Sequence, residues 1–188
     1  EYEDDHSLSS IDHKYEDIQN LYLKVKLKNH QIEGVAWMQS LWNKYAPGCL
    51  LADDMGLGKT IQVLAFLEWL AYKKEVYYTL TVVPVALLEN WMEEYASYFN
   101  KGLYETIILN DQLSIDLCFK EVQKIDHKRS VLYLAGYETL RKYQLKLCSL
   151  NWDVIVLDEA QRIKTPGRMI TNAAKALKDR FKIAMTGT

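Results

Sequence analysis

Six short apolar segments, separated by stretches of helical or polar pattern, constrain the fold more than any other feature of the sequence. They are rich in β-branched and aromatic residues, and several lack the alternation of polar and apolar residues that a half-exposed strand shows. Segments of this kind are typical of strands that are covered on both faces. They occupy residues 49–52, 78–83, 104–109, 131–135, 153–157 and 181–186.

Between these segments, apolar residues recur at helical spacing. Such stripes run through 32–45, 85–99 and 170–177, and the apolar sequence IQVLAFLEWL follows Lys59. Strands that alternate with helices predict right-handed crossovers and a mainly parallel central sheet. We therefore predict an α/β fold, a three-layer αβα domain, in which ligands bind beyond the carboxyl ends of the strands.

The composition excludes several classes of protein. A hydrophobic content of 49% is too high for a disordered chain, and the longest apolar runs are far shorter than the about 20 residues that span a membrane. The three cysteines lack CxxC spacing, which favours neither a disulfide framework nor a zinc site. The N-terminus is acidic and carries no apolar leader, so we expect an intracellular protein without membrane contact.

Negative charge is concentrated at the start of the chain, although the net charge is only -2. The first twenty residues hold seven acidic side chains and one lysine, and the remainder is mildly basic. We interpret residues 1–26 as an acidic N-terminal extension, most simply a solvated terminus. The alternative is a segment that occupies a basic groove until it is displaced.

The five tryptophans follow the helical and strand stripes. We therefore expect them to pack in the core or between helices, rather than to stack on bases. They are Trp37, Trp42, Trp69, Trp91 and Trp152.

The segment after the first apolar run has the composition of a phosphate-binding loop. It reads Asp53-Asp54-Met55-Gly56-Leu57-Gly58-Lys59-Thr60, and Asp53 stands where the full GxxxxGK[ST] pattern has its first glycine. The glycines let successive N–H groups turn toward an anion, and the helix that follows adds its positive dipole end. We predict that Lys59 contacts the β- and γ-phosphates of a nucleotide and that Thr60 binds magnesium.

Two acidic residues directly follow the apolar run 153–157. We predict that Asp158 holds magnesium, directly or through water, and that Glu159 polarises the attacking water in phosphoryl transfer. Such a pair at the end of a strand is common and carries little weight alone. Its position roughly a hundred residues after a phosphate loop makes it informative. At the end of the last run, Thr186 and Thr188 are candidates to contact the acid pair or a nucleic-acid phosphate, or are simply a polar strand end.

The order of these segments resembles that of the superfamily-two helicase-like ATPases, and closely that of the Swi/Snf-type DNA translocases. Residues 27–38 resemble the Q motif, in which Gln31 would read the adenine, and 53–60 resemble motif I, with Asp54 where many eukaryotic members have Glu. The remaining likenesses are Val83-Pro84 with Asn90, Trp91 and Glu94 for motif Ia, 135–141 for motif Ib, 158–164 for motif II and 184–188 for motif III.

The resemblance implies a RecA-like P-loop NTPase lobe that spans residues 27–188, the first of two such lobes, with the second lobe absent. It implies ATP and Mg²⁺ as cofactors. The implied catalytic residues are Lys59, Asp158, Glu159 and Gln161, and the implied cofactor contacts are Gln31, Asp54, Met55, Gly56, Leu57, Gly58, Lys59 and Thr60. The implied contacts to the phosphate backbone of double-stranded DNA are Pro84, Asn90, Tyr137, Arg141, Arg162, Lys164, Thr186 and Thr188. The basic residues among them are equally typical of solvated helix ends.

We therefore expect the ATP-binding lobe of a DNA-dependent ATPase that translocates on double-stranded DNA and remodels protein–DNA complexes. The isolated lobe should be nearly inactive, because the resemblance assigns the arginine finger to the second lobe of the parent chain. We also expect the isolated lobe to be monomeric. Three alternatives stay open: another superfamily-two translocase, an RNA helicase, or a nucleotide-gated interaction module without turnover. The sequences DDMGLGKT and DEAQ favour the prokaryotic branch and hence the cytoplasm or nucleoid; a eukaryotic member would be nuclear.

Overall fold

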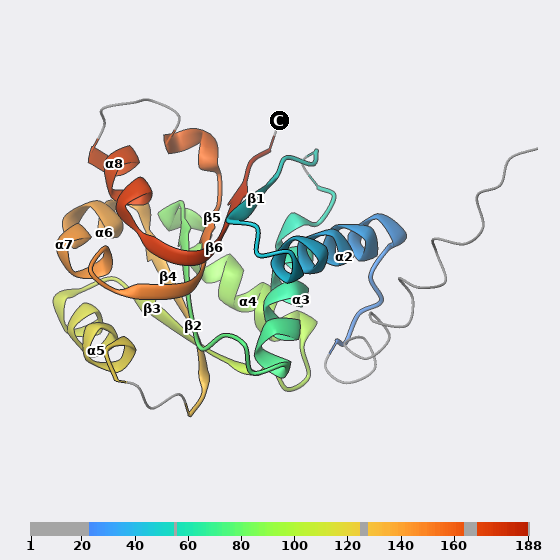
Figure 1. The fold of residues 1–188 in the computed structure, drawn as a ribbon, viewed down its shortest axis with the longest axis horizontal. Helices are drawn as coiled ribbons and strands as arrows, with labels where there is room; N and C mark the ends of the chain where they lie inside the picture. The colour runs from blue at the N-terminus through green and yellow to red at the C-terminus, as the bar shows by residue number, and fades with distance from the viewer. Residues whose placement is uncertain (1–22, 55, 125–127, 164–168, 188) are drawn as a thin grey trace, which may run out of the picture.

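The computed structural model describes residues 23–54, 56–124, 128–163 and 169–187. Their six strands form one sheet in the order β1-β6-β5-β2-β4-β3, and every pairing is parallel (Figure 1). The strands are β1 (Gly48–Leu51), β2 (Tyr78–Val83), β3 (Tyr104–Leu109), β4 (Ser130–Gly136), β5 (Asn151–Leu157) and β6 (Lys178–Met185). Each predicted strand is present, and the predicted α/β class is confirmed.

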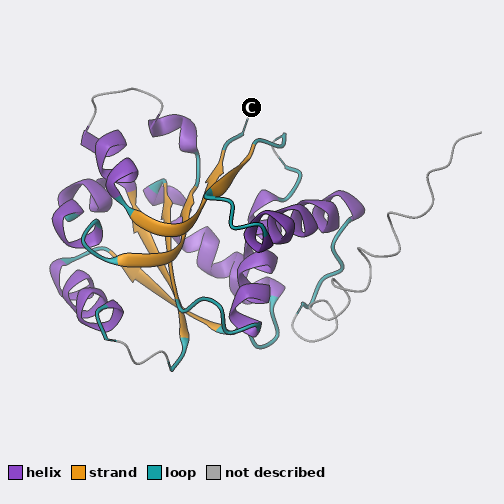
Figure 2. Cartoon of the chain, in the orientation of Figure 1, coloured by secondary structure: helices purple, strands orange, loops and turns teal. Residues whose placement is uncertain are grey.

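Helices cover both faces of the sheet, which gives the three layers (Figure 2). One face packs against α2 (Asn29–Asn43), α3 (Lys59–Tyr72) and α4 (Leu88–Tyr98), which the 3-10 turn η1 (Val85–Leu87) precedes. The other face packs against α5 (Gln112–Val122), α6 (Tyr137–Lys142), α7 (Gln144–Leu147) and α8 (Met169–Ala176). A second 3-10 turn, η2 (Ala160–Ile163), follows β5.

The central strands divide their side chains between the two faces with a period of two. In β5, Val154 and Val156 join the core under α2, α3 and α4, whereas Ile155 and Leu157 join the core under α5 to α8. Because both sets are buried, the strand reads as a continuous apolar run. This explains why the sequence signal lacked alternation.

Helix α5 is the largest element that the apolar pattern did not predict. Its Leu113 and Leu117 are exposed, while Ile115 and Cys118 are buried, so its apolar residues do not form a single stripe. A local signal was available at its start, because Asp111 accepts a hydrogen bond from the Ser114 amide (2.8 Å) in a capping box.

Four tryptophans are buried as expected, whereas Trp37 on α2 is 43% exposed. Cys118 is buried, and Cys49 and Cys148 are half-buried. Across the described ranges, no helix is both long and apolar enough to cross a membrane, and no group of three or more His, Cys, Asp or Glu side chains is arranged to hold a metal ion.

The predicted acidic extension lies mostly outside the described residues. Where the description begins, Leu23 forms an antiparallel bridge with Phe99, and the Lys24 amide donates to the Tyr98 carbonyl (2.7 Å). The chain thus packs against the domain from Leu23 onward, a few residues before the predicted boundary at residue 27.

Candidate functional site

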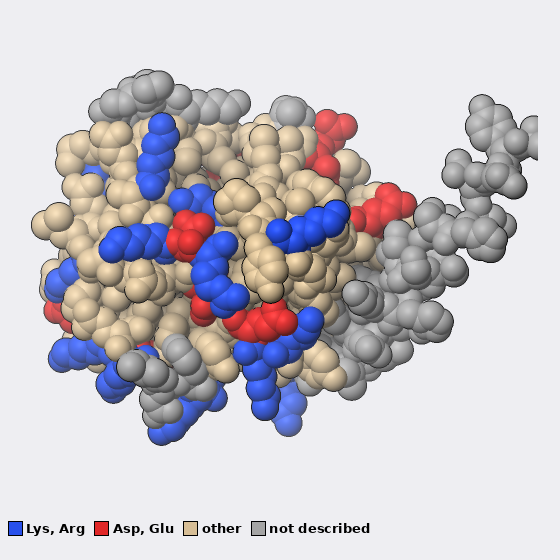
Figure 3. Space-filling view, in the orientation of Figure 1, with Lys and Arg blue, Asp and Glu red and all other residues tan. Residues whose placement is uncertain are grey.

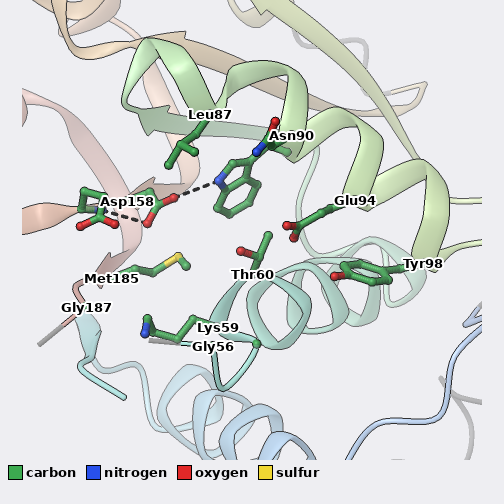
Figure 4. Close-up of a pocket in the computed structure, with 13 residues that line it drawn as sticks. Gly56, Lys59, Thr60, Leu87, Asn90, Glu94, Tyr98, Asp158, Met185 and Gly187 are labelled. Atoms are coloured by element: carbon green, nitrogen blue, oxygen red, sulfur yellow. Dashed lines mark hydrogen bonds between the residues drawn. The ribbon is translucent and has the colours of Figure 1, made fainter. Parts of the chain in front are cut away.

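A cavity of about 310 Å³ lies beyond the carboxyl ends of β1, β5 and β6 (Figure 4). It is lined by the glycine turn, the first residues of α3, one side of α4 and the turn after β5. Lys59 and Thr60 therefore face Asp158 and Glu159 across one space, although the two pairs are far apart in the sequence. The placement follows from the parallel sheet, whose strand ends meet at one edge.

The glycine turn needs its glycines for their backbone conformation. Gly56 and Gly58 have φ angles of 83° and 76°, in the left-handed region that side chains disfavour. A Cβ at Gly58 would also approach Gln31 Nε2 to 2.4 Å, whereas a Cβ at Gly56 would meet nothing within 4 Å. The turn is thus closed on the side of α2 and open beside Gly56.

Lys59 begins α3 and bends back over this turn. Its ammonium group donates to the carbonyl oxygens of Asp53 (2.5 Å) and Asp54 (2.9 Å). The lysine is therefore held at the mouth of the turn, beside the N-terminus of a 14-residue helix. Positive charge and a helix N-terminus in this arrangement suit a phosphate group.

Gln31 supports the turn and is not among the side chains that line the cavity. Its Nε2 donates to the Leu57 carbonyl (3.1 Å), and its Oε1 accepts from the Lys28 amide (2.9 Å). Only 8% of Gln31 is exposed. The structure thus gives Gln31 a loop-bracing position; its predicted contact with adenine stays a prediction. Met55 lies outside the described residues.

Asp158 is held from several directions. Its Oδ2 accepts from Trp91 Nε1 (3.0 Å), its Oδ1 accepts from the Glu159 amide (2.9 Å), and its own amide donates to the Val82 carbonyl (2.9 Å). Burial raises the pKa of Asp158, while the bond from Trp91 lowers it. A carboxylate that is fixed yet faces a cavity is suited to binding a cation.

Glu159 adopts a left-handed backbone conformation, with φ of 52°. For a residue with a side chain this conformation costs on the order of 1–3 kcal/mol and persists only where the surroundings fix it. The side chain is fixed as well, since Gln161 Nε2 donates to the Glu159 carboxylate and Thr186 Oγ1 donates to Gln161 Oε1 (2.8 Å). Gln161 and Thr186 therefore support the acid pair, which was one of the two expectations for Thr186; its DNA contact stays a prediction.

Two side chains of this site were not assigned to it from the sequence. Trp91, expected as a core residue, is buried but also donates to Asp158. Glu94 lies one turn further along α4 and lines the cavity next to Thr60. Burial raises the pKa of Glu94, contacts with the Thr60 and Tyr98 hydroxyls lower it, and the charge of Asp158 raises it further. The sequence signal available for these two residues was their i, i+3 spacing, which places both side chains on the same side of a helix.

Asn90 lies at the first cavity. It was grouped with the DNA contacts, but it lines the same cavity as Lys59 and Thr60. It lies on the first turn of α4, and its predicted DNA contact stays a prediction.

Four of the other predicted DNA contacts meet in a second cavity of about 710 Å³, next to the first. Pro84, Tyr137, Arg141 and Arg162 all line it. Arg141 pairs with Glu138 (2.7 Å) and stays half-exposed, whereas Tyr137 is only 5% exposed and its hydroxyl donates to the Asp158 carbonyl (2.6 Å). The Tyr137 hydroxyl is thus engaged inside the domain, and the predicted DNA contact of Tyr137 stays a prediction. Lys164 and Thr188 lie outside the described residues.

Basic side chains do not form one continuous stripe on the face seen in Figure 3, where several lie beside acidic ones. On this face, therefore, positive charge is distributed in local groups rather than in a single basic surface.

Comparison with known proteins identifies the family. Residues 30–188 match the family model of the SNF2-related domain. The chain is 39% identical to the Zorya protein ZorD of Escherichia coli, over 87% of this chain and 17% of that protein. It is 31% identical to the ISWI chromatin-remodeling complex ATPase ISW1 of Saccharomyces cerevisiae, over 89% of this chain and 14% of that protein.

A solved structure agrees with this assignment. The SWI2/SNF2 ATPase core of Sulfolobus solfataricus, determined in complex with double-stranded DNA, superposes with a TM-score of 0.74 and 34% identity over 89% of this chain and 33% of that one. The chain thus spans about a third of that core and less than a fifth of either curated relative. The predicted resemblance to Swi/Snf-type ATPases is confirmed, and the chain belongs to the SNF2-related family.

Proposed function

We propose that this chain is the first RecA-like, ATP-binding lobe of a DNA-dependent ATPase that translocates on double-stranded DNA and remodels protein–DNA complexes. The observation that carries the proposal is the convergence of Lys59, Thr60, Asp158 and Glu159 on one cavity at the carboxyl edge of the sheet. These groups come from two segments that are distant in the sequence, and they supply the charges that a magnesium-bound triphosphate requires.

The donor set of the cavity fits magnesium and a triphosphate. The open side of the turn beside Gly56 leaves room for phosphate oxygens, and Lys59 supplies a positive charge there. Thr60 and Asp158 would hold Mg²⁺, one through a hydroxyl and one through a carboxylate. Bound Mg²⁺ would neutralise the charge that develops on the phosphates. Gln31 would contact the adenine, as in the family, and it also braces the turn through its bond to the Leu57 carbonyl.

Glu159 is the residue placed to orient a water molecule and accept its proton. Its carboxylate lines the cavity, and Gln161 and Thr186 hold it there through consecutive hydrogen bonds. Because the backbone at Glu159 is left-handed, the carboxylate leaves the strand end at an angle that a regular turn would not give. Loss of Gln161 would therefore misplace this base rather than remove it.

Hydrolysis at a useful rate requires a second lobe of the same parent chain. Arginine fingers contribute on the order of 10³–10⁵ in rate to related phosphoryl transfers. We expect the lobe alone to bind ATP weakly, to hydrolyse it very slowly and to be monomeric.

Double-stranded DNA is the proposed macromolecular partner. The cavity lined by Pro84, Arg141 and Arg162 suits a backbone phosphate, and the matched Sulfolobus core was solved with double-stranded DNA. Phosphate contacts of this kind are independent of sequence and weaken steeply with salt.

The test is the ATPase rate of the full-length protein with duplex DNA, single-stranded DNA, RNA or no nucleic acid. We expect stimulation by duplex DNA, loss of turnover in Lys59→Ala, and little change in Lys26→Ala, an exposed lysine outside both cavities. Stimulation by RNA alone would instead indicate an RNA helicase. Nucleotide binding without turnover under every condition would indicate a nucleotide-gated interaction module.

A further inference from the structure

Tyr137 lines the second cavity and is bonded to a residue that lines the first. It is the first residue of α6, and its side chain lines the cavity that also holds Arg141 and Arg162. Its hydroxyl leaves that cavity and donates to the main-chain carbonyl of Asp158 (2.6 Å), whose carboxylate faces the other cavity. A single side chain thus joins the proposed phosphate contacts to the proposed magnesium ligand.

The turn that Tyr137 holds is sensitive to small displacements. Glu159 is in the left-handed region, so the conformation depends on the bonds that surround it. The Glu159 amide donates to Asp158 Oδ1 (2.9 Å) and the Asp158 amide donates to the Val82 carbonyl (2.9 Å). Two further backbone bonds are the Tyr137 bond to the Asp158 carbonyl and the bond from the Arg162 amide to the Glu159 carbonyl (2.9 Å). Arg162 also lines the second cavity, so both of these bonds come from residues at that cavity.

The hydroxyl of Tyr137 is suited to act as a permanent donor. The residue is 5% exposed, and burial, followed by the negative charge of Asp158, raises its pKa above the ordinary range. The Tyr137 hydroxyl is already bonded to the Asp158 carbonyl. The ring, rather than the hydroxyl, therefore lies on the side of the second cavity.

We propose that Tyr137 is a positioning residue that couples occupation of the second cavity by a nucleic-acid phosphate to the placement of Asp158 and Glu159 in the first. A phosphate drawn in by Arg141 and Arg162 shifts the start of α6 and η2, and the two backbone hydrogen bonds carry that shift to the acid pair. The proposal rests on the proposed ATPase function and adds a structural route for stimulation by nucleic acid.

The experiment compares Tyr137→Phe with the unmodified full-length protein, with Tyr143→Phe as the matched control. Tyr143 is a half-buried tyrosine of the same segment and lines neither of the two cavities. For each protein we would measure the ATPase kcat and the KM for ATP, without and with saturating duplex DNA. The Kd for that DNA and the melting temperature would be measured as well.

We expect Tyr137→Phe to lower the DNA-stimulated kcat about tenfold, the effect of losing one well-placed hydrogen bond. The KM for ATP and the Kd for DNA should stay within about twofold of the unmodified protein, and Tyr143→Phe should behave like the unmodified protein.

Three results would separate the explanations. Unchanged DNA stimulation in Tyr137→Phe would overturn the inference and leave the proposed function intact. Weakened DNA binding with full stimulation at saturating DNA would make Tyr137 a DNA contact and would also overturn it. Absence of turnover in the unmodified protein with every nucleic acid would refute the proposed function itself, and the inference with it.

Discussion

Helix α4 presents two aromatic donors, one turn apart, to two carboxylates with different surroundings, one buried and one half-buried. Trp91 donates its indole N–H to Asp158 Oδ2 (3.0 Å), and Tyr95 donates its hydroxyl to the Glu68 carboxylate. Burial is the first cause of the raised pKa at both acids.

The two carboxylates differ in what else surrounds them. Glu68 is 1% exposed, and its two oxygens also accept from the Leu103 amide at 2.9 and 3.1 Å, so the group is enclosed and fully paired. Asp158 instead keeps one side toward the cavity that holds Lys59 and Thr60. A buried acid with every acceptor paired stabilises the fold, whereas one that is fixed but open to a cavity is available for chemistry.

The substitution with the largest expected effect on activity is Asp158→Asn, which tests whether this acid serves chemistry rather than stability. The amide keeps the shape and an acceptor for Trp91 but removes the charge that would hold magnesium. We expect the DNA-stimulated ATPase rate of the full-length protein to fall on the order of 10²–10³-fold, with a melting temperature within about 2 °C of the unmodified protein. A variant that melts much earlier yet keeps most of its activity would reverse the roles of the two acids.

At the enclosed acid, Glu68→Ala should act on stability. It leaves the Tyr95 hydroxyl and the Leu103 amide without their acceptor and opens a cavity beside α3, at a cost of about 3 kcal/mol in the free energy of unfolding. Denaturant unfolding measures this loss, and Glu89→Ala, at an exposed glutamate of α4, is the matched control. The folded fraction should bind nucleotide like the unmodified protein; a selective loss of nucleotide affinity would contradict the structural role.

The pH dependence of stability sharpens the same contrast. Burial raises the pKa of Glu68 to about 7, from 4.5 in the unfolded chain. The folded state therefore binds the proton more tightly, so this contribution is complete below about pH 4.5 and is lost as the pH rises through about 7. Its size is about 3 kcal/mol. Unfolding curves between pH 4.5 and 8 should show a slope that Glu68→Gln flattens; equal slopes in the two proteins would place the Glu68 pKa in its ordinary range.

The smallest expected effect comes from removing each of the two aromatic donors separately. Trp91→Phe and Tyr95→Phe should both lower stability by about 1–2 kcal/mol, because each removes a buried hydrogen bond. Only Trp91→Phe should also lower kcat, by about tenfold, because only its acceptor faces the cavity. Equal kcat values for the two variants would mean that the bond to Asp158 does not position the carboxylate.

The sequence predicted those features whose signals are local. The six strands appear as short apolar runs, and the glycine turn and the acid pair each lie directly after a strand. Parallel topology then brings the two polar segments together without further information. The family resemblance added the expected cofactors and the order of the motifs.

Features that depend on distant partners were not predictable in this way. Trp91 was expected as a core residue and Tyr137 as a DNA contact, because nothing in the adjacent sequence reveals that their polar atoms meet Asp158. The position of Asn90 at the first cavity was not predicted for a similar reason, since it depends on how α4 packs in the fold. Helix α5 was missed because its exposed leucines interrupt the apolar stripe.

The most direct test of the central claim is the equilibrium affinity of the full-length protein for ATP with Mg²⁺, measured by calorimetry in the unmodified protein and in Lys59→Ala. If the cavity between α3 and the turn after β5 is the ATP site, Lys59→Ala weakens ATP binding by about 10–100-fold, because a charge-assisted contact to phosphate is lost. The control variant Glu68→Gln leaves the ATP affinity unchanged. Equal affinity in the unmodified protein and Lys59→Ala would show that ATP does not bind at this cavity.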